Sequence, residues 1–188
     1  MAAVDRKTFN RRNFLKLAGG VVATSAASRS WAKGLASQHP ERSLQFYNLH
    51  TGEHIQTPYW IEGEYLDEGL TQINNVLRDH RNGEIMEIDL GLLEMLHDLQ
   101  LKMDSKQPFH VISGYRSPQT NAMLRQNSSG VAKKSLHMQG MAIDIRLPDI
   151  HLPDLKVGAL SLKRGGVGYY PRSDFVHLDV GRVRTWNG

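Results

Sequence analysis

His137, Asp144 and His177 have the side chains and the surroundings expected of a metal site. His137 and Asp144 belong to the pattern Ser-x-His-x-x-Gly-x-Ala-x-Asp, in which the carboxylate falls inside a predicted strand. His177 lies in a later apolar strand, where it shares a face with Asp179. Two polar groups on so apolar a strand need a partner, and a metal ion would provide one. Two imidazoles and one carboxylate form a ligand set of catalytic zinc, which leaves a fourth position for water.

The spacing alone allows a second interpretation of these residues, because a His–Asp hydrogen bond in a protein core would use the same side chains. The chain has no cysteine, so a metal could be held only by histidine or carboxylate side chains. Gly140, between His137 and Asp144, would permit a positive φ angle or a close backbone approach where the chain enters the site. Six further histidines have no comparable setting and are expected to be packing or surface residues: His50, His54, His80, His97, His110 and His151.

The first 32 residues are typical of a twin-arginine export signal rather than of a folded element. Arg11-Arg12 precedes Phe-Leu-Lys, an uncharged stretch and a small-x-small cleavage site at residues 30–32; an amphipathic N-terminal helix is the alternative. We therefore expect export to the periplasm, with cleavage or retention as an anchor left open. Residues 1–32 carry a net charge of +5 and the chain +4, so the remainder carries −1. That remainder gives no sign of a nucleic-acid partner, and no apolar run reaches the roughly 18 residues of a membrane span.

The periodicity of the remaining chain predicts an α+β domain over residues 44–188, after a flexible lead-in over residues 33–43. Its fold class is expected to be N-terminal helices packed on a small, mainly antiparallel sheet. The predicted strands cover residues 44–49 and 55–60, as a hairpin, and then 109–112, 141–145, 166–170 and 175–180. The predicted helices run from about Glu64 to His80, from the N-cap Asp89 with Leu92, Leu93, Leu96, Leu99 and Leu101 buried, and from Ser117-Pro118.

Several motifs extend the metal pattern over most of the chain. They are Asn48-Leu49-His50-Thr51-Gly52-Glu53, Ser113-Gly114-Tyr115-Arg116-Ser117, Asn121, Gly140, Ala142, Gly165-Gly166-Val167-Gly168-Tyr169-Tyr170-Pro171 and Phe175-Val176-His177-Leu178-Asp179. Together they resemble the zinc peptidases of the D-Ala-D-Ala carboxypeptidase superfamily, which share a fold with the N-terminal domain of hedgehog, and within it the YcbK-like murein endopeptidase branch. The resemblance runs from about residue 44 to Trp186. It implies zinc bound by His137, Asp144 and His177, and hydrolysis of cross-links between peptidoglycan stem peptides.

The resemblance also implies catalytic residues. The superfamily's matching arginine, here Arg116, binds substrate or stabilises the oxyanion; a surface ion pair is the alternative. Many relatives carry a glutamate three residues before the last ligand, in a Glu-x-x-His pattern. This chain departs from that pattern by having the shorter Asp174 there. Asp179 is the rival and preferred candidate for the general base, although it could instead orient a ligand imidazole.

Other functions would use the same residues. A metal-containing module that binds peptidoglycan without turnover and a D,D-carboxypeptidase are the alternatives, and a hedgehog-type surface protein is a weaker one. The sequence leaves open whether a D,D or an L,D bond is cut, and it does not give the oligomeric state.

Overall fold

A mixed sheet of eight strands is the frame on which the described part of the chain is built. The computed structural model describes residues 41–127 and 130–188. The predicted signal, residues 1–32, and residues 33–40 of the predicted lead-in lie outside the described residues. The first strand begins at Glu41, three residues before the predicted start of the domain.

In chain order the elements are β1 (Glu41–Asn48), β2 (His54–Ile61), β3 (Glu64–Tyr65), α2 (Asp67–Val76), α3 (Leu90–Met103), β4 (Phe109–Ser113), α4 (Pro118–Asn127), the 3-10 helix η1 (Leu136–Gln139), β5 (Ala142–Arg146), α5 (Leu152–Ser161), β6 (Gly166–Tyr170), β7 (Phe175–Asp179) and β8 (Arg184–Asn187). No helix among residues 41–127 and 130–188 is both long and apolar enough to span a membrane.

The predicted fold class is confirmed as α+β, but the sheet has eight strands and is not small. The strands follow the order β3-β2-β1-β4-β5-β7-β6-β8, and the N-terminal hairpin belongs to the same sheet as the later strands. Two pairs are parallel, β1 with β4 and β6 with β8, while the other five are antiparallel. β1 and β4 can be parallel because α2 and α3 provide the long crossover that parallel neighbours require.

The predicted hairpin is confirmed by the antiparallel register of β1 and β2. Alternate residues of β1, Leu44, Phe46 and Asn48, point into the interior, as expected of a strand with one buried face. Gly52 has a φ of 73° in the connecting turn, a conformation that glycine adopts without strain. The buried Asn48 side chain accepts a hydrogen bond from the amide of His50, so it closes the turn from inside.

The helices differ from the prediction at their ends and on one face. α2 begins at Asp67 because Glu64 and Tyr65 pair with β2 as β3. The Asp89 cap of α3 is confirmed, since its side chain accepts a hydrogen bond from the Gly91 amide. The prediction that Leu101 is buried was wrong: 65% of it is exposed, because it lies two residues, or about 200° of helix rotation, beyond the buried Leu99.

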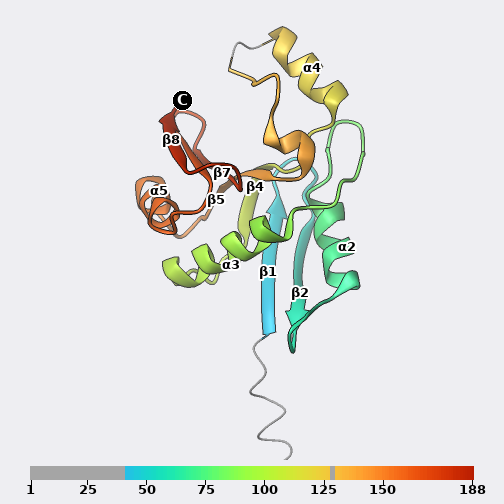
Figure 1. Ribbon diagram of the computed structural model, residues 1–188, viewed down its shortest axis with the longest axis vertical. Helices are drawn as coiled ribbons and strands as arrows, with labels where there is room; N and C mark the ends of the chain where they lie inside the picture. Colours follow the sequence, from blue (N-terminus) through green and yellow to red (C-terminus); the bar gives the residue numbers. More distant parts are fainter. Residues whose placement is uncertain (1–40, 128–129) are drawn as a thin grey trace, which may run out of the picture. The chain divides into compact units, whose positions relative to one another are not determined.

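The helices α2, α3 and α5 cover one face of the sheet, and Asp144 and His177 lie on the other. α2 packs on β2, α3 on β1, and α5 on β6 and β7 (Figure 1). The residues of β5 and β7 that are buried in the core are Ile143, Ile145, Val176 and Leu178. Asp144 and His177 alternate with them and therefore face away from the core.

Candidate active site

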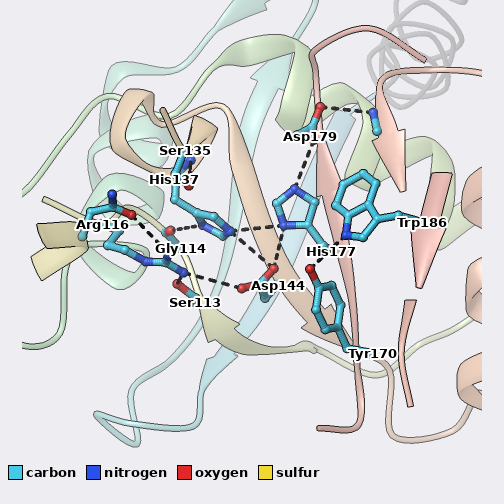
Figure 2. A network of polar contacts seen from close by, with 12 residues as sticks. Ser113, Gly114, Arg116, Ser135, His137, Asp144, Tyr170, His177, Asp179 and Trp186 are labelled. Carbon is cyan, nitrogen blue, oxygen red and sulfur yellow. Dashed lines mark hydrogen bonds and ion pairs between the residues drawn. The ribbon is translucent and has the colours of Figure 1, made fainter. Parts of the chain in front are cut away.

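His137, Asp144 and His177 converge on one point (Figure 2). Asp144 lies opposite His177 in the antiparallel pair β5–β7, and His137 comes from η1, just before β5. His177 Nδ1 lies 2.8 Å from Asp144 Oδ1. His137 Nε2 lies 3.2 Å from His177 Nδ1 and 3.4 Å from Asp144 Oδ1. The predicted grouping of these three side chains therefore matches the structure.

His137 is held so that one ring nitrogen faces the other two residues. Its Nδ1 lies 2.7 Å from the carbonyl oxygen of Gly114, to which it donates, leaving Nε2 as a lone-pair donor. Ser135 caps η1 by accepting from the His137 amide. Gly140 ends η1 with a φ of 67°, which confirms the positive φ expected from a glycine at this position. A Cβ there would overlap the carbonyl oxygen of Glu87. The turn that carries His137 thus depends on a glycine at this position.

His177 is held from behind by Asp179. Its Nε2 lies 3.1 Å from Asp179 Oδ2, so Nε2–H donates to the carboxylate and Nδ1 keeps its lone pair toward His137 and Asp144. Asp179 is completely buried. Its Oδ1 accepts from the amides of Gly166 and Gly181 and from Arg184 Nη1, and its Oδ2 also accepts from Arg184 Nη2 at 2.6 Å.

The charges around the cluster favour a cation. Burial alone would raise the pKa of Asp144, but the neighbouring His137 and His177 rings hold it well below its usual range. Burial opposes protonation of His177, yet its hydrogen bonds to Asp144 and Asp179 raise its pKa to about 9. Two carboxylates therefore stabilise positive charge at this imidazole, and a metal ion would supply that charge.

The donor set and its spacing fit zinc. With ligand distances of about 2.1 Å, donor atoms around a tetrahedral zinc ion lie roughly 3.4 Å apart. The three donor atoms here are separated by 2.8 to 3.4 Å. Among the described residues no other group of three His, Cys, Asp or Glu side chains converges in this way. His137, Asp144 and His177 could therefore hold a zinc ion and leave a fourth position open.

Arg116 lies beside this cluster, as its place between β4 and α4 predicted. Its guanidinium lies 4.0 Å from Asp144 Oδ2 and within 3.5 Å of Ser113 Oγ and Asn121 Oδ1. Burial lowers its pKa, and the Asp144 carboxylate opposes that shift. The guanidinium is thus held in place but only loosely bonded, which suits a group that binds an incoming anion.

A cavity of about 490 Å³ joins the cluster to Arg116. Its lining includes Asp144, His177 and Asp179 but not Asp174. Asp174 is exposed, has a φ of 54° and forms an ion pair with Arg146. The two candidates for the general base are therefore placed differently: Asp174 lies outside the cavity, and Asp179 lies behind the His177 imidazole with both oxygens engaged.

Several residues of the cavity lining were not predicted to belong to the site, among them Tyr170, Arg184 and Trp186. Tyr170 belongs to the glycine-rich motif of residues 165–171, which carries the family resemblance. Arg184 and Trp186 belong to β8, a strand that was not predicted from the sequence. The pairing register brings them in: Asp144, His177, Gly168 and Trp186 form one row across β5, β7, β6 and β8. Gly166 and Gly168 of β6 leave room for the side chains of a neighbouring strand. This Gly-x-Gly pattern could have indicated from the sequence that side chains from another strand lie across β6.

Comparison with known proteins gives a consistent family. The family model described as peptidoglycan L,D-endopeptidase MepK matches residues 36–186. The peptidoglycan L,D-endopeptidase MepK of Escherichia coli K12 is 43% identical over 183 residues, covering 97% of this chain and all of that protein. The probable peptidoglycan L,D-endopeptidase MepK of Haemophilus influenzae is 37% identical over 180 residues, covering 95% of this chain and 96% of its own. No solved structure matches the chain. The chain therefore belongs to the peptidoglycan L,D-endopeptidase MepK family.

Proposed function

We propose that this chain is a zinc-dependent peptidoglycan endopeptidase that hydrolyses L,D peptide bonds in the cross-links between stem peptides. The observation that carries the proposal is the convergence of His137, Asp144 and His177 in the wall of a cavity that also contains Arg116. The names of the relatives from E. coli and H. influenzae support the L,D bond. Their alignment covers nearly the whole chain, so the domain that bears the site corresponds to theirs.

His137 Nε2, Asp144 Oδ1 and His177 Nδ1 are the proposed zinc ligands. Zinc, when bound, supplies a Lewis acid that polarises a peptide carbonyl and lowers the pKa of a water molecule. Gly114 and Asp179 fix the two ring orientations by accepting from the nitrogens that face away from the cluster.

Arg116 is the proposed substrate-binding residue. Stem peptides carry carboxylates, and a guanidinium binds a carboxylate through two parallel hydrogen bonds. Its position 4.0 Å from Asp144 Oδ2 also allows it to stabilise negative charge on the reacting carbonyl oxygen.

Asp179 is proposed to orient His177 rather than to act as the general base. A base must reach a proton of the reacting groups, directly or through one water molecule. Both oxygens of Asp179 are occupied by Arg184, His177 and backbone amides. The same carboxylate has a pKa held well below its usual range: burial opposes this shift, and the hydrogen bonds from His177 and Arg184 outweigh burial.

Two further parts of the proposal concern fold and location. The helices on one face of a mixed sheet, with a site on the other, support the fold shared by hedgehog and the D-Ala-D-Ala zinc peptidases. A substrate in the cell wall agrees with the predicted twin-arginine signal over residues 1–32, so we propose export to the periplasm.

The proposal is tested by digesting purified peptidoglycan with the full chain and reading the products by mass spectrometry. Dimers joined by L,D bonds and dimers joined by D,D bonds are followed separately, with and without a zinc chelator. His177→Ala is the inactive variant, and His54→Ala, at an exposed histidine at the start of β2, is the matched control.

We expect loss of L,D-joined dimers with the wild-type chain and with His54→Ala. Chelation and His177→Ala should both abolish this loss. Release of terminal D-alanine alone would instead indicate a carboxypeptidase. Unchanged dimers despite stoichiometric zinc would indicate a binding module, and either result would refute the proposed activity.

A further inference from the structure

An aromatic wall made by Tyr170, Phe175 and Trp186 forms one side of the cavity. Figure 2 shows Tyr170 and Trp186 on one side of Asp144 and His177, and Arg116 on the other. Tyr170 and Arg116 nevertheless line the same cavity. A peptide bound over the cluster would therefore lie between the guanidinium and the phenol.

The hydroxyl of Tyr170 is oriented by Trp186. The indole Nε1–H donates to the Tyr170 oxygen at 2.9 Å, and an indole nitrogen can only donate. The phenol oxygen is therefore the acceptor in this bond. Its own hydrogen remains available to a ligand in the cavity.

Packing holds the wall in place before any substrate binds. The rings of Tyr170 and Phe175 stack with centroids 4.5 Å apart and an interplanar angle of 16°. The Trp186 ring lies with its centroid 5.2 Å from that of His177, and the Arg184 guanidinium lies 4.9 Å from the Trp186 centroid. A donor fixed in this way needs little reorganisation when charge develops next to it.

Gly168 makes room for this arrangement. It pairs with Trp186 across the parallel strands β6 and β8. A Cβ on Gly168 would lie 2.6 Å from Trp186 Cε2, closer than carbon atoms can approach. The glycine thus allows the indole to lie across β6 and reach Tyr170, two residues along the same strand face.

We propose that Tyr170 is a catalytic residue whose hydroxyl donates a hydrogen bond to the carbonyl oxygen of the scissile peptide as that oxygen gains negative charge, with Trp186 as its positioning residue. This rests on the proposed endopeptidase function. No bond to Tyr170 forms or breaks, and its proton stays on the phenol. With Tyr170 serving the carbonyl oxygen, Arg116 on the opposite side is left to bind a carboxylate of the stem peptide.

The test compares Tyr170→Phe, Trp186→Phe and the double variant, all in the full chain loaded with zinc. Tyr170→Phe keeps the ring that stacks on Phe175 and removes only the hydroxyl. Tyr169→Phe is the matched control, because Tyr169 neighbours it on β6 but contacts Lys156 and lies outside the cavity lining. The readouts are kcat and KM on purified L,D-joined dimers, zinc content, and the affinity for a non-cleavable phosphinate analogue of the tetrahedral state.

We expect Tyr170→Phe to lower kcat about 100-fold, as loss of one oxyanion donor does. KM should change less than about threefold and zinc content should stay at the wild-type value. Affinity for the phosphinate should fall roughly in parallel with kcat, because both depend on the same hydrogen bond. Trp186→Phe should have a smaller effect, and the double variant should be no slower than Tyr170→Phe, since the two residues act through one hydroxyl.

Wild-type kcat in Tyr170→Phe, an equal loss in Tyr169→Phe, or a loss that follows zinc content would overturn the inference while leaving the endopeptidase function intact. Additive losses in the double variant would refute the positioning role of Trp186. If the wild-type chain cleaves no peptidoglycan bond, the proposed function fails and the inference fails with it.

Discussion

Replacing Asp179 with asparagine separates the two roles considered for this carboxylate. Asp179 is completely buried and accepts five hydrogen bonds, three on Oδ1 and two on Oδ2. An asparagine keeps one acceptor oxygen. With that oxygen in the place of Oδ1, the new amide N–H groups point at two donors, His177 Nε2–H and Arg184 Nη2.

Two donors that face one another cannot form a hydrogen bond, so His177 regains this hydrogen bond only by changing its tautomer. Its proton then moves to Nδ1, the nitrogen that faces Asp144 and His137, and that nitrogen can no longer bind a metal. Loss of an orienting partner typically costs about 10- to 100-fold in metal affinity. Losing charged hydrogen bonds at Arg184 should also destabilise the metal-free protein by about 2–3 kcal/mol.

The measurement is a zinc titration against a competing chelator, combined with turnover at limiting and at saturating zinc. If Asp179 orients His177, Asp179→Asn lowers the zinc affinity, and saturating zinc restores much of the turnover. The matched control is Asp174→Asn. Asp174 is exposed, lies outside the cavity and has a φ of 54° that asparagine tolerates, so affinity and turnover should both be unchanged. Wild-type zinc affinity in Asp179→Asn, together with lost turnover at saturating zinc, would refute the orienting role and support a general base.

Three further outcomes are expected. Zinc at about 100 times its Kd should stabilise the chain by about 2.7 kcal/mol. The stabilisation should appear as a rise in Tm that is lost when a chelator is added or when His177 is replaced by alanine. An unchanged Tm on addition of zinc would contradict the ligand assignment. Gly140→Ala should lower the free energy of unfolding by about 2 kcal/mol or more, because the φ of 67° and the nearby Glu87 carbonyl oxygen disfavour a side chain. Calorimetry should show a lower Tm and weaker zinc binding. Burial and the stacked His50 ring lower the pKa of His80 to about 4. Because His80 then takes up a proton more readily in the unfolded chain, the free energy of unfolding should fall as the pH falls from about 6.5 to 4. Denaturant unfolding of His80→Gln should show a weaker decline over that range, and a decline identical to that of the wild-type chain would contradict this assignment.

The convergence of His137, Asp144 and His177 could be predicted from the sequence because strand periodicity and a short pattern are local signals. His137 and Asp144 are seven residues apart, and a period of two places Asp144 and His177 on the faces of their strands that look away from the apolar residues. The roles of Asp174 and Asp179 could not be read in the same way. A period of two shows that Asp179 shares a face with His177, but not that Arg184 and two backbone amides already occupy its oxygens.

The elements that were not predicted, or were predicted wrongly, also depend on information that the local sequence does not carry. Leu101 continues a leucine-rich run but lies on the far side of the helix, where the composition gives no warning. α5 carries its buried Leu155 and Ala159 in a short segment whose apolar residues do not form a clear stripe. β8 has only four residues, and its strand character comes from parallel pairing with β6 rather than from its own sequence.

β8 shows how a strand without ligands can still determine the chemistry of the site. Its pairing with β6 places Arg184 opposite Gly166, beside Asp179, and Trp186 opposite Gly168, beside His177. Arg184 pairs with the Asp179 carboxylate that contacts His177, and Trp186 donates a hydrogen bond to the hydroxyl of Tyr170. Both side chains reach across β6 because that strand presents glycine at both positions. A one-residue shift in this register would turn both side chains to the opposite face of the sheet and remove both functions together. The Gly-x-Gly of β6 and the Arg-x-Trp of β8 therefore act as one unit, and a substitution in either should affect the site even though neither segment contains a proposed zinc ligand.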